Sequence, residues 1–425
     1  MRSVGKAVRG CLVAGTVVAV VACGGSGTTD TTRTATTPGN IHSRIVDIYS
    51  SLPLQGPLAA QGQAIVKGIE LALSQAGGRA GIWTINYQSR DDATAGQQAW
   101  DAGATGANAR LVAEDPKAVY YVGEFSSLAS EVSLPILNQA KVPQVSPANT
   151  YLGLTAAAPG SSSKEPASPS GVRSYLRLVP NDSVQAAADL EAMKEAGCRK
   201  VALATTSGDA YGAEFTALFA TDKGAYGVTV ASTSTLDMSA SSFHGYTAGL
   251  KSQGVDCVFL AASASSWAVT LTEAIDAAVP KVRLFGPDQM CVGAWTDPKL
   301  GGVPASVASR IECTMPVLSI DSYPGGRRFL VDYKAKYGNA EPNAYAIYGY
   351  EAMKLGLDTI SKLGPAGNDK LAVLKALFSV RNRSSVLGTY GFDRKGDTTL
   401  RSFGLYRVGS DGQPRFYKSL TPPTS

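Results

Sequence analysis

Histidine is nearly absent from this chain of 425 residues, which contains only His42 and His244. Neither a GxSxG nor an HExxH motif occurs. Serine–histidine hydrolases need a histidine base beside the nucleophile, and zincins bind zinc through two histidines on one helix. We therefore expect no catalytic residue, no metal site and no cofactor.

Charge is also sparse, because charged residues make up 17% of the chain while hydrophobic residues make up 44%. This balance is typical of globular proteins, and the length is sufficient for two domains with a core each. The formal net charge is +5, and it falls to +2 without Arg2, Lys6 and Arg9, which lie in a segment that we expect to be removed. This charge gives no indication of nucleic-acid binding.

Long hydrophobic runs are confined to the N-terminus. A basic start leads into the apolar run 11–22, and Cys23 follows it. The uncharged stretch 10–26 is shorter than the ~20 residues that a membrane-spanning helix needs. It resembles a lipoprotein signal peptide, because Val20-Val21-Ala22-Cys23 fits the lipobox pattern, in which small residues precede a cysteine that accepts a diacylglycerol.

We therefore predict a signal peptide over residues 1–22 and lipidation of Cys23. The mature protein would lie outside the cytoplasm and be anchored to the cell membrane by its N-terminal lipid. Residues 23–42 are rich in Gly, Ser and Thr, which bury little apolar surface, so this stretch is expected to be a flexible tether.

Four further cysteines remain in the mature chain, namely Cys198, Cys257, Cys291 and Cys313. An even number in an exported protein favours disulfides, with buried reduced thiols as the alternative. Four cysteines allow three pairings. A zinc site is disfavoured because no CxxC spacing occurs.

Short β-branched runs alternate with helical patterns along the mature chain, which is typical of parallel sheets with crossover helices. The first series predicts strands at 44–49, 83–88, 118–123 and 143–146 and helices at 65–76, 97–114 and 128–140. The polar insertion 156–171 has no periodicity and is expected to be an exposed loop.

After this insertion the same alternation returns. It predicts strands at 174–178, 201–205, 228–232, 257–261, 282–285 and 311–316, with helices at 183–196, 213–223 and 246–252. The tail predicts helices at 327–337, 344–362 and 370–377 and antiparallel strands at 403–407 and 416–420.

We therefore predict an α/β protein with two doubly wound, Rossmann-like lobes. The first lobe would contain 43–175 and 317–380, and the second 176–316 and 381–425, because the chain is expected to recross between lobes in its tail. In a doubly wound sheet the strands that begin near Val201 and Cys257 are neighbours. This order favours the pair Cys198–Cys257, and the same logic favours Cys291–Cys313.

Residues 123–127 stand where such sheets bind ligands, which is beyond the carboxyl ends of strands. Gly123 lets the backbone turn, and Ser126 and Ser127 can cap the next helix while its unpaired N–H groups face a ligand. The loop can hold a carboxylate without a basic side chain, although an ordinary N-cap would have the same sequence.

From about Ile45 to Leu420 the chain resembles the branched-chain amino acid binding proteins of periplasmic binding protein type I. The resemblance rests on the order and spacing of short motifs that are weak individually. These are Gly56-Pro57 before a first helix ending at Gly77-Gly78, Asp91-Asp92, the loop 123–127, Pro147-Ala148-Asn149-Thr150 before Leu154-Thr155, Tyr211-Gly212, Gly286-Pro287-Asp288, and Phe392-Asp393 with Gly396-Asp397. It implies two lobes joined by a multi-strand hinge.

The resemblance also implies ligand-binding residues in the first lobe. A ligand carboxylate would meet Ser127, with Ser126 beside it. A ligand ammonium would meet the backbone carbonyl of Ala148 and the hydroxyl of Thr150. From the second lobe, the resemblance implies that Asp288 completes the ammonium site and that Tyr211 closes over the ligand.

Three positions depart from the leucine-binding pattern or extend it. Gln61 and Ser263 stand where those proteins have tyrosines, and Trp267 is either an apolar pocket wall or a simple packing residue. The cystine of their first lobe is also absent, because its positions fall on Thr94 and Ser126. The sequence therefore predicts an altered side-chain pocket, so leucine itself need not be the ligand.

The resemblance implies a monomeric solute-binding protein that captures an amino acid or a similar small polar solute by hinge closure. Its partner would be the permease of an ABC importer. A ligand-sensing subunit for a membrane receptor, with the same binding fold, is the alternative.

Overall fold

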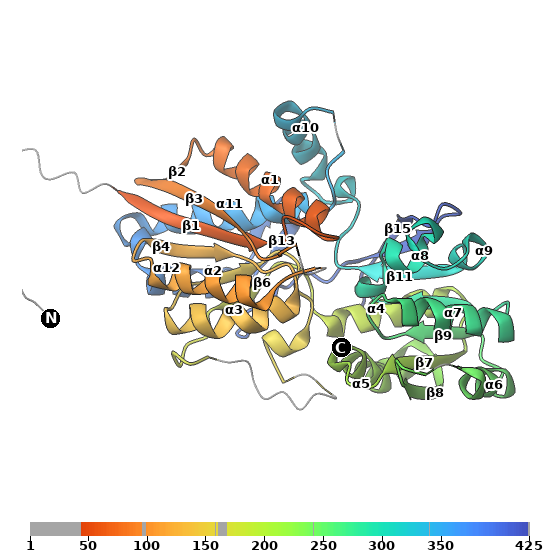
Figure 1. The fold of residues 1–425 in the computed structure, drawn as a ribbon. Coiled ribbons are helices and arrows are strands. Elements are labelled where there is room, and N and C mark those ends of the chain that lie inside the picture. Colours follow the sequence, from red (N-terminus) through yellow and green to blue (C-terminus); the bar gives the residue numbers. More distant parts are fainter. Residues whose placement is uncertain are drawn as a thin grey trace, which may run out of the picture. The chain divides into compact units, whose positions relative to one another are not determined.

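Two mainly parallel sheets organise residues 44–425 (Figure 1). The computed structural model describes these residues except 96–98, 158, 160–167, 241, 340 and 424–425, and it describes all their side chains except those of 222 and 223. The predicted signal peptide, lipidated cysteine and tether lie outside the described residues. Within the described part, none of the helices has the length and apolar character needed to span a membrane.

The first sheet has the strand order β2-β3-β1-β4-β5-β6 and is parallel except for the β2–β3 pair. Its strands are β1 (Ile45–Leu52), β2 (Arg79–Ala80), β3 (Trp83–Asp91), β4 (Ala118–Val122), β5 (Gln144–Ser146) and β6 (Tyr175–Arg177). Ile48 and Tyr120 lie in one apolar cluster, whereas their neighbours Tyr49 and Tyr121 lie in another. This alternation shows that the sheet is buried on both faces.

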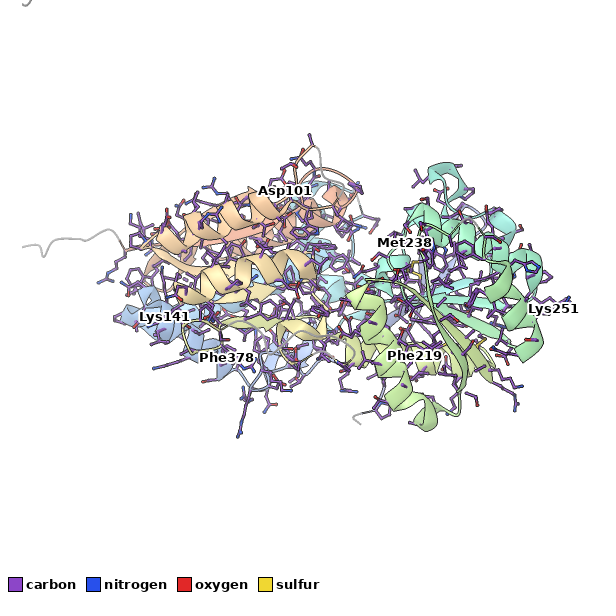
Figure 2. All side chains as sticks on the ribbon, turned by 60° about the horizontal axis from the view of Figure 1, so that its bottom comes forward. Asp101, Lys141, Phe219, Met238, Lys251 and Phe378 are labelled. Carbon is purple, nitrogen blue, oxygen red and sulfur yellow. A yellow bond between two sulfur atoms is a disulfide. The ribbon has the colours of Figure 1, made fainter. Side chains whose placement is uncertain are left out.

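Helices cover both faces of the first sheet. One core includes residues of α1 (Ala59–Gln75), α10 (Gly326–Tyr337), α11 (Ala346–Leu363) and α12 (Lys370–Phe378), and the other includes residues of α2 (Ala102–Glu114) and α3 (Ser127–Gln139). Asp101 caps α2, because its carboxylate accepts a hydrogen bond from the backbone N–H of Ala104 at 2.7 Å (Figure 2).

The second sheet has the order β15-β14-β11-β10-β9-β7-β8, and β14 and β15 are its antiparallel strands. Its strands are β7 (Lys200–Thr206), β8 (Thr229–Leu236), β9 (Cys257–Leu260), β10 (Arg283–Gly286), β11 (Ile311–Met315), β14 (Phe403–Val408) and β15 (Pro414–Leu420). Val201 and Leu203 face one core, and Ala202 and Ala204 face the other.

The helices of this second sheet divide in the same way. The core that contains Phe219 (Figure 2) is shared with α4 (Asp182–Glu195) and α5 (Ala210–Tyr226). The opposite core includes residues of α6 (His244–Gln253), α7 (Ser266–Ala278), α8 (Gly293–Thr296) and α9 (Ala305–Ala308). The remaining short elements are the hairpin β12 (Arg383–Ser385) and β13 (Gly388–Tyr390) and the 3-10 helices η1 (Leu152–Leu154), η2 (Asp288–Met290), η3 (Pro298–Leu300), η4 (Ile320–Ser322) and η5 (Gly364–Asn368).

The predicted α/β class with two parallel-sheet lobes is confirmed, and each predicted strand and helix is present with shifted ends. The helix predicted over 97–114 begins at Ala102, where Asp101 caps it. The sequence reasoning missed α7 and the hairpin β12–β13. The hairpin is short and polar and therefore carries little hydrophobic pattern.

The division of the chain between lobes stays a prediction, and core packing bears on two of its boundaries. Strand β6 pairs with β5 in the first sheet, although the second lobe was expected to begin at 176. Tyr390 and Phe392 pack in the core of the first sheet, although they were expected in the second lobe. These contacts favour assigning both segments to the first lobe.

Both predicted disulfides are present. Cys198 and Cys257 join the amino-terminal ends of β7 and β9, with a Cα–Cα distance of 5.8 Å. Cys291 and Cys313 join the segment after η2 to β11, with a Cα–Cα distance of 5.5 Å. The second disulfide therefore anchors the loop that carries Asp288.

Candidate ligand-binding site

The loop between β4 and α3 lies at the carboxyl end of a central strand of the first sheet. Gly123 has a φ of 154°, and a Cβ there would lie 2.7 Å from the carbonyl oxygen of Ser51, so a side chain does not fit. Ser126 occupies the N-cap position of α3 but makes no side-chain cap bond. The Ser127 hydroxyl accepts a hydrogen bond from the backbone N–H of Tyr151 at 3.4 Å. The first turn of α3 therefore begins without a capping side chain.

A buried asparagine joins this loop to the segment after β5. The side-chain amide of Asn149 donates to the carbonyl oxygens of Glu124 and Phe125, at 3.1 and 2.8 Å. The hydroxyl of Ser146 accepts from the backbone N–H groups of Ala148 and Asn149, at 3.2 and 3.0 Å. These bonds hold the segment with Ala148 against the serine loop.

Thr150 extends this segment to the beginning of α4. Its carbonyl oxygen accepts a hydrogen bond from the backbone N–H of Asp182 at 2.8 Å. Its hydroxyl also hydrogen-bonds the carboxyl group of Asp182, which is completely buried. Thr150 is thus linked to the first helix after the first sheet.

Tyr211 and Asp288 meet beyond the carboxyl ends of β7 and β10. The Tyr211 hydroxyl donates to Asp288 Oδ1 at 2.6 Å, and the backbone N–H of Gln289 donates to the same oxygen at 2.8 Å. A Cβ on Gly212 would lie 2.2 Å from the carbonyl oxygen of Ala261. Glycine therefore lets α5 approach the sheet closely enough for Tyr211 to reach Asp288.

Electrostatic interactions connect Thr150 with the pair Tyr211 and Asp288. Burial raises the pKa of Asp288, and the hydrogen bond from Tyr211 partly offsets this effect. Burial and the charges of Glu214 and Asp288 raise the pKa of Asp182 well above its usual range. Because Asp182 hydrogen-bonds Thr150 and interacts with Asp288, the structure brings Thr150, Tyr211 and Asp288 into one network.

Sequence reasoning missed three carboxyl groups of this network, Asp182, Asp189 and Glu214. Glu214 Oε1 accepts a hydrogen bond from the backbone N–H of Leu152 at 3.2 Å, so it joins α5 to the segment after Thr150. Its position three residues after Tyr211 puts both side chains on one face of a helix, which was an available signal. Asp182 directly follows the N-cap Asn181 and has the sequence of an ordinary helix start.

Two aromatic rings that the sequence analysis did not select also lie here. The Tyr345 and Phe125 rings pack edge to face with centroids 5.0 Å apart. Burial and the charge of Asp288 raise the pKa of Tyr345 well above its usual range, so Tyr345 lies near the carboxylate. Phe125 belongs to the serine loop, and these rings provide an apolar surface beside the polar groups.

Of the three predicted pocket-wall residues, Ser263 lies next to the Asp288 segment, whereas Gln61 and Trp267 lie elsewhere. Ser263 is exposed and donates to Gln289, next to Asp288. Gln61 lies on the first turn of α1, and its buried side-chain oxygen has no hydrogen-bond partner among the described residues. Trp267 is buried in the core beside Phe243 and is not brought together with the network.

The described residues contain one cluster of three side chains with metal-binding atoms, namely Cys198, Asp256 and Cys257. The disulfide between its cysteines removes their thiolates as ligands. A separate surface cavity of about 420 Å³ is lined by residues of α6 and α7, including His244 and Thr270. It shares no residue with the network around Asp288.

The family model described as periplasmic binding protein matches residues 50–413, which is most of the chain. This chain belongs to the periplasmic binding protein family. It is therefore a binding protein and not an enzyme, and its family acts outside the cytoplasm. No curated protein matches the sequence.

Solved structures of this family have the same fold as the chain. The leucine binding protein LivK of Thermotoga maritima is 20% identical, with a TM-score of 0.67 over 89% of this chain and 99% of that one. LivJ of Streptococcus pneumoniae, in complex with isoleucine, is 18% identical, with a TM-score of 0.66 over 89% and 99%. An R. palustris solute binding protein in complex with benzoate is 20% identical, with a TM-score of 0.64 over 89% and 97%.

Proposed function

We propose that this periplasmic binding protein captures an amino acid or an amino-acid-like solute by hinge closure and delivers it to an ABC importer. Structural neighbours were solved in complex with leucine, isoleucine, benzoate and 4-hydroxybenzoate, and each of these ligands carries a carboxylate. A carboxylate is the group that a helix N-terminus with neighbouring hydroxyls favours.

In the proposed complex, Ser126, Ser127 and the first N–H groups of α3 bind the ligand carboxylate. The carbonyl of Ala148 and the hydroxyl of Thr150 accept hydrogen bonds from the ligand ammonium. These groups come from loops that follow adjacent strands, so the ligand docks on them first.

The second sheet then contributes Asp288 to the ammonium, and Tyr211 covers the ligand. The observation that carries this proposal is the position of the Asp288 carboxylate. It is held by Tyr211 and is joined to Thr150 through Asp182. A buried carboxylate without a cation is costly, and an ammonium beside it relieves that cost.

We further propose that the protein is a monomeric lipoprotein. The lipobox at Val20-Val21-Ala22-Cys23 supports cleavage before Cys23 and attachment of a lipid to its thiol. The Gly-, Ser- and Thr-rich stretch 23–42 would then connect the lipid to the folded part.

A thermal-shift screen of residues 40–425 against amino acids, amides, short peptides and polyols tests the proposed solute class. A tight ligand raises the melting temperature by mass action, because it binds the folded state only. We expect the largest shifts with α-amino acids, followed by calorimetric titration of the best ligands. Shifts confined to polyols or peptides would contradict the proposal.

A further inference from the structure

The proposed ligand site contains more negative charge than one ammonium can balance. Four carboxyl groups interact within it, namely Asp182, Asp189, Glu214 and Asp288. Each of the first three is at most 1% exposed. Each also has one buried carboxylate oxygen that no hydrogen-bond donor reaches in the described part of the chain.

The charge of Arg177 opposes the rise that burial causes in the pKa of Asp182 and Glu214, but Arg177 already pairs with another carboxylate. Its side chain forms an ion pair with Asp397 at 2.7 Å. It also donates to the carbonyl oxygen of Tyr151 and to the hydroxyl of Thr155, both at 2.7 Å. Because Asp397 balances the charge of Arg177, the four carboxyl groups of the site have no counterion of their own among the residues that the structure describes.

A neutral amino acid does not balance this charge. Its ammonium would pair with Asp288, whereas its carboxylate would add another negative charge to the same region. Asp182 and Glu214 would still have buried oxygens without a donor. Buried carboxylates in this state are costly unless a cation or a proton reaches them.

The arrangement of Glu214 suggests where a second cation would lie. Its Oε1 accepts from the backbone N–H of Leu152, while its Oε2 is buried and has no donor in the portion of the chain that the structure describes. Tyr211, one helical turn earlier on α5, contacts Asp288. A ligand whose ammonium reaches Asp288 would therefore lie along the face of α5 that also carries Glu214.

We propose that the solute is a basic amino acid, whose α-ammonium pairs with Asp288 and whose distal cation is bound by Glu214 and Asp182. This inference rests on the proposed function and specifies its ligand. Lysine, ornithine and arginine share the required chemistry. The serine loop retains the α-carboxylate, which distinguishes these ligands from diamines.

Protons provide the competing way to neutralise the site. Burial raises the pKa of Glu214 to about 7, and the backbone N–H of Leu152 and the charge of Arg177 oppose this shift. Without a ligand, Glu214 therefore holds a proton over part of the neutral pH range. A basic amino acid would displace this proton, so its binding should release protons, whereas binding of a neutral amino acid should not.

Calorimetric titration with lysine and norleucine tests the inference, because the two ligands differ chiefly in the distal ammonium. We expect lysine to bind at least tenfold more tightly and to release protons, as measured in buffers of different ionisation enthalpy. Equal affinities, or tighter binding of norleucine, would overturn the inference while leaving the proposed function intact. Failure of both ligands and of all other α-amino acids would overturn the proposed function itself.

Two variants locate the distal cation. Glu214→Gln keeps an acceptor for the Leu152 N–H but loses the charge, and it should lower the affinity for lysine about tenfold with little effect on norleucine. The matched control Glu312→Gln removes a carboxylate that pairs with Arg407 elsewhere in the second sheet, and it should change neither affinity. An equal loss of both ligands in Glu214→Gln would show a structural role and overturn the assignment. Putrescine binding more tightly than lysine would overturn the requirement for an α-carboxylate.

Discussion

Asp288 is the residue on which the proposed site depends most directly. Its carboxylate accepts two hydrogen bonds at one oxygen, from Tyr211 and from the backbone N–H of Gln289. Burial nevertheless raises its pKa, so these bonds do not replace the solvation that it has lost. A ligand ammonium would supply the missing charge.

The variant Asp288→Ala is expected to weaken ligand binding about a hundredfold, or by ~3 kcal/mol, because it removes one partner of a buried charge pair. Isothermal titration with the best ligand of the screen measures this change. Glu341→Ala, which removes an exposed carboxylate, serves as the control and should bind normally. Unchanged affinity in Asp288→Ala would remove Asp288 from the site.

A second pair of carboxyl groups, Asp92 and Glu124, is buried in the first sheet with no exposed surface. Both oxygens of Asp92 and one of Glu124 lack a donor among the described residues, yet the two carboxyl groups interact with each other. Burial favours the protonated form of both groups. Burial raises the pKa of Asp92 to about 7, and the interaction with Glu124 partly offsets this.

This pair should make the protein less stable as the pH rises. Because the folded-state pKa of Asp92 lies above its ordinary value of 3.8, its ionisation destabilises the fold increasingly between about pH 4 and pH 7. Asp92→Asn should therefore be more stable than the parent protein at pH 8, by on the order of 2 to 4 kcal/mol, and similar to it at pH 4. Urea unfolding at both pH values measures the difference, and an equal effect at both would contradict the raised pKa of Asp92.

Among the structural elements, the short helix η2 has the most direct bearing on function, because it carries Asp288 and ends next to Cys291. The disulfide to Cys313 joins this segment to β11. Strand β11 pairs in parallel with β10, and the segment follows the carboxyl end of β10. The other disulfide, Cys198–Cys257, joins β7 and β9 at their amino-terminal ends, away from the carboxyl ends beyond which Tyr211 and Asp288 lie.

Removing the two disulfides should therefore have different consequences. The double variant Cys291→Ala/Cys313→Ala should lose about 3 kcal/mol of stability and also bind its ligand more weakly, because the Asp288 segment gains freedom. Cys198→Ala/Cys257→Ala should lose about 4 kcal/mol, since it opens a longer loop, but keep its affinity. Titration below the melting temperature of each variant separates the two effects. Equal affinities for both double variants would show that the Cys291–Cys313 disulfide does not position Asp288.

At the scale of the whole molecule, the two sheets have separate cores, and loops that follow the strands of each sheet carry the proposed ligand-binding residues. Hydrogen bonds such as that from the backbone N–H of Leu152 to Glu214 join segments that follow strands of the first and second sheets. Hinge closure around a ligand is a common motion for two α/β units joined by a few chain crossings. The proposed lipid anchor would keep this movement close to the membrane permease.

The anchor can be separated from binding by a single substitution. Cys23→Ala should release the protein into the soluble fraction and leave its affinity for the ligand unchanged, because Cys23 is the predicted lipidation site and is not one of the proposed ligand-binding residues. Membrane fractionation followed by titration of the soluble material measures both properties. Membrane retention of the variant would contradict the lipobox assignment.

The sequence determined the fold class, because alternating strand and helix patterns are local properties that survive without tertiary information. It also favoured the two disulfides that the structure contains, since a doubly wound sheet makes the strands that begin near Val201 and Cys257 neighbours. Motif order was enough to select Thr150, Tyr211 and Asp288, which the structure brings into one network.

The tertiary structure alone decided which other charges join this network. Asp182 and Glu214 have the local sequence of a helix start and of a helix surface, and only the packing of α4 and α5 against the segment after Thr150 buries them. The sequence left Trp267 as either a pocket wall or a packing residue for the same reason, because only the tertiary structure shows that it packs in the core. Burial depends on the approach of distant segments, and so do the charge balance and the ligand class that follow from it.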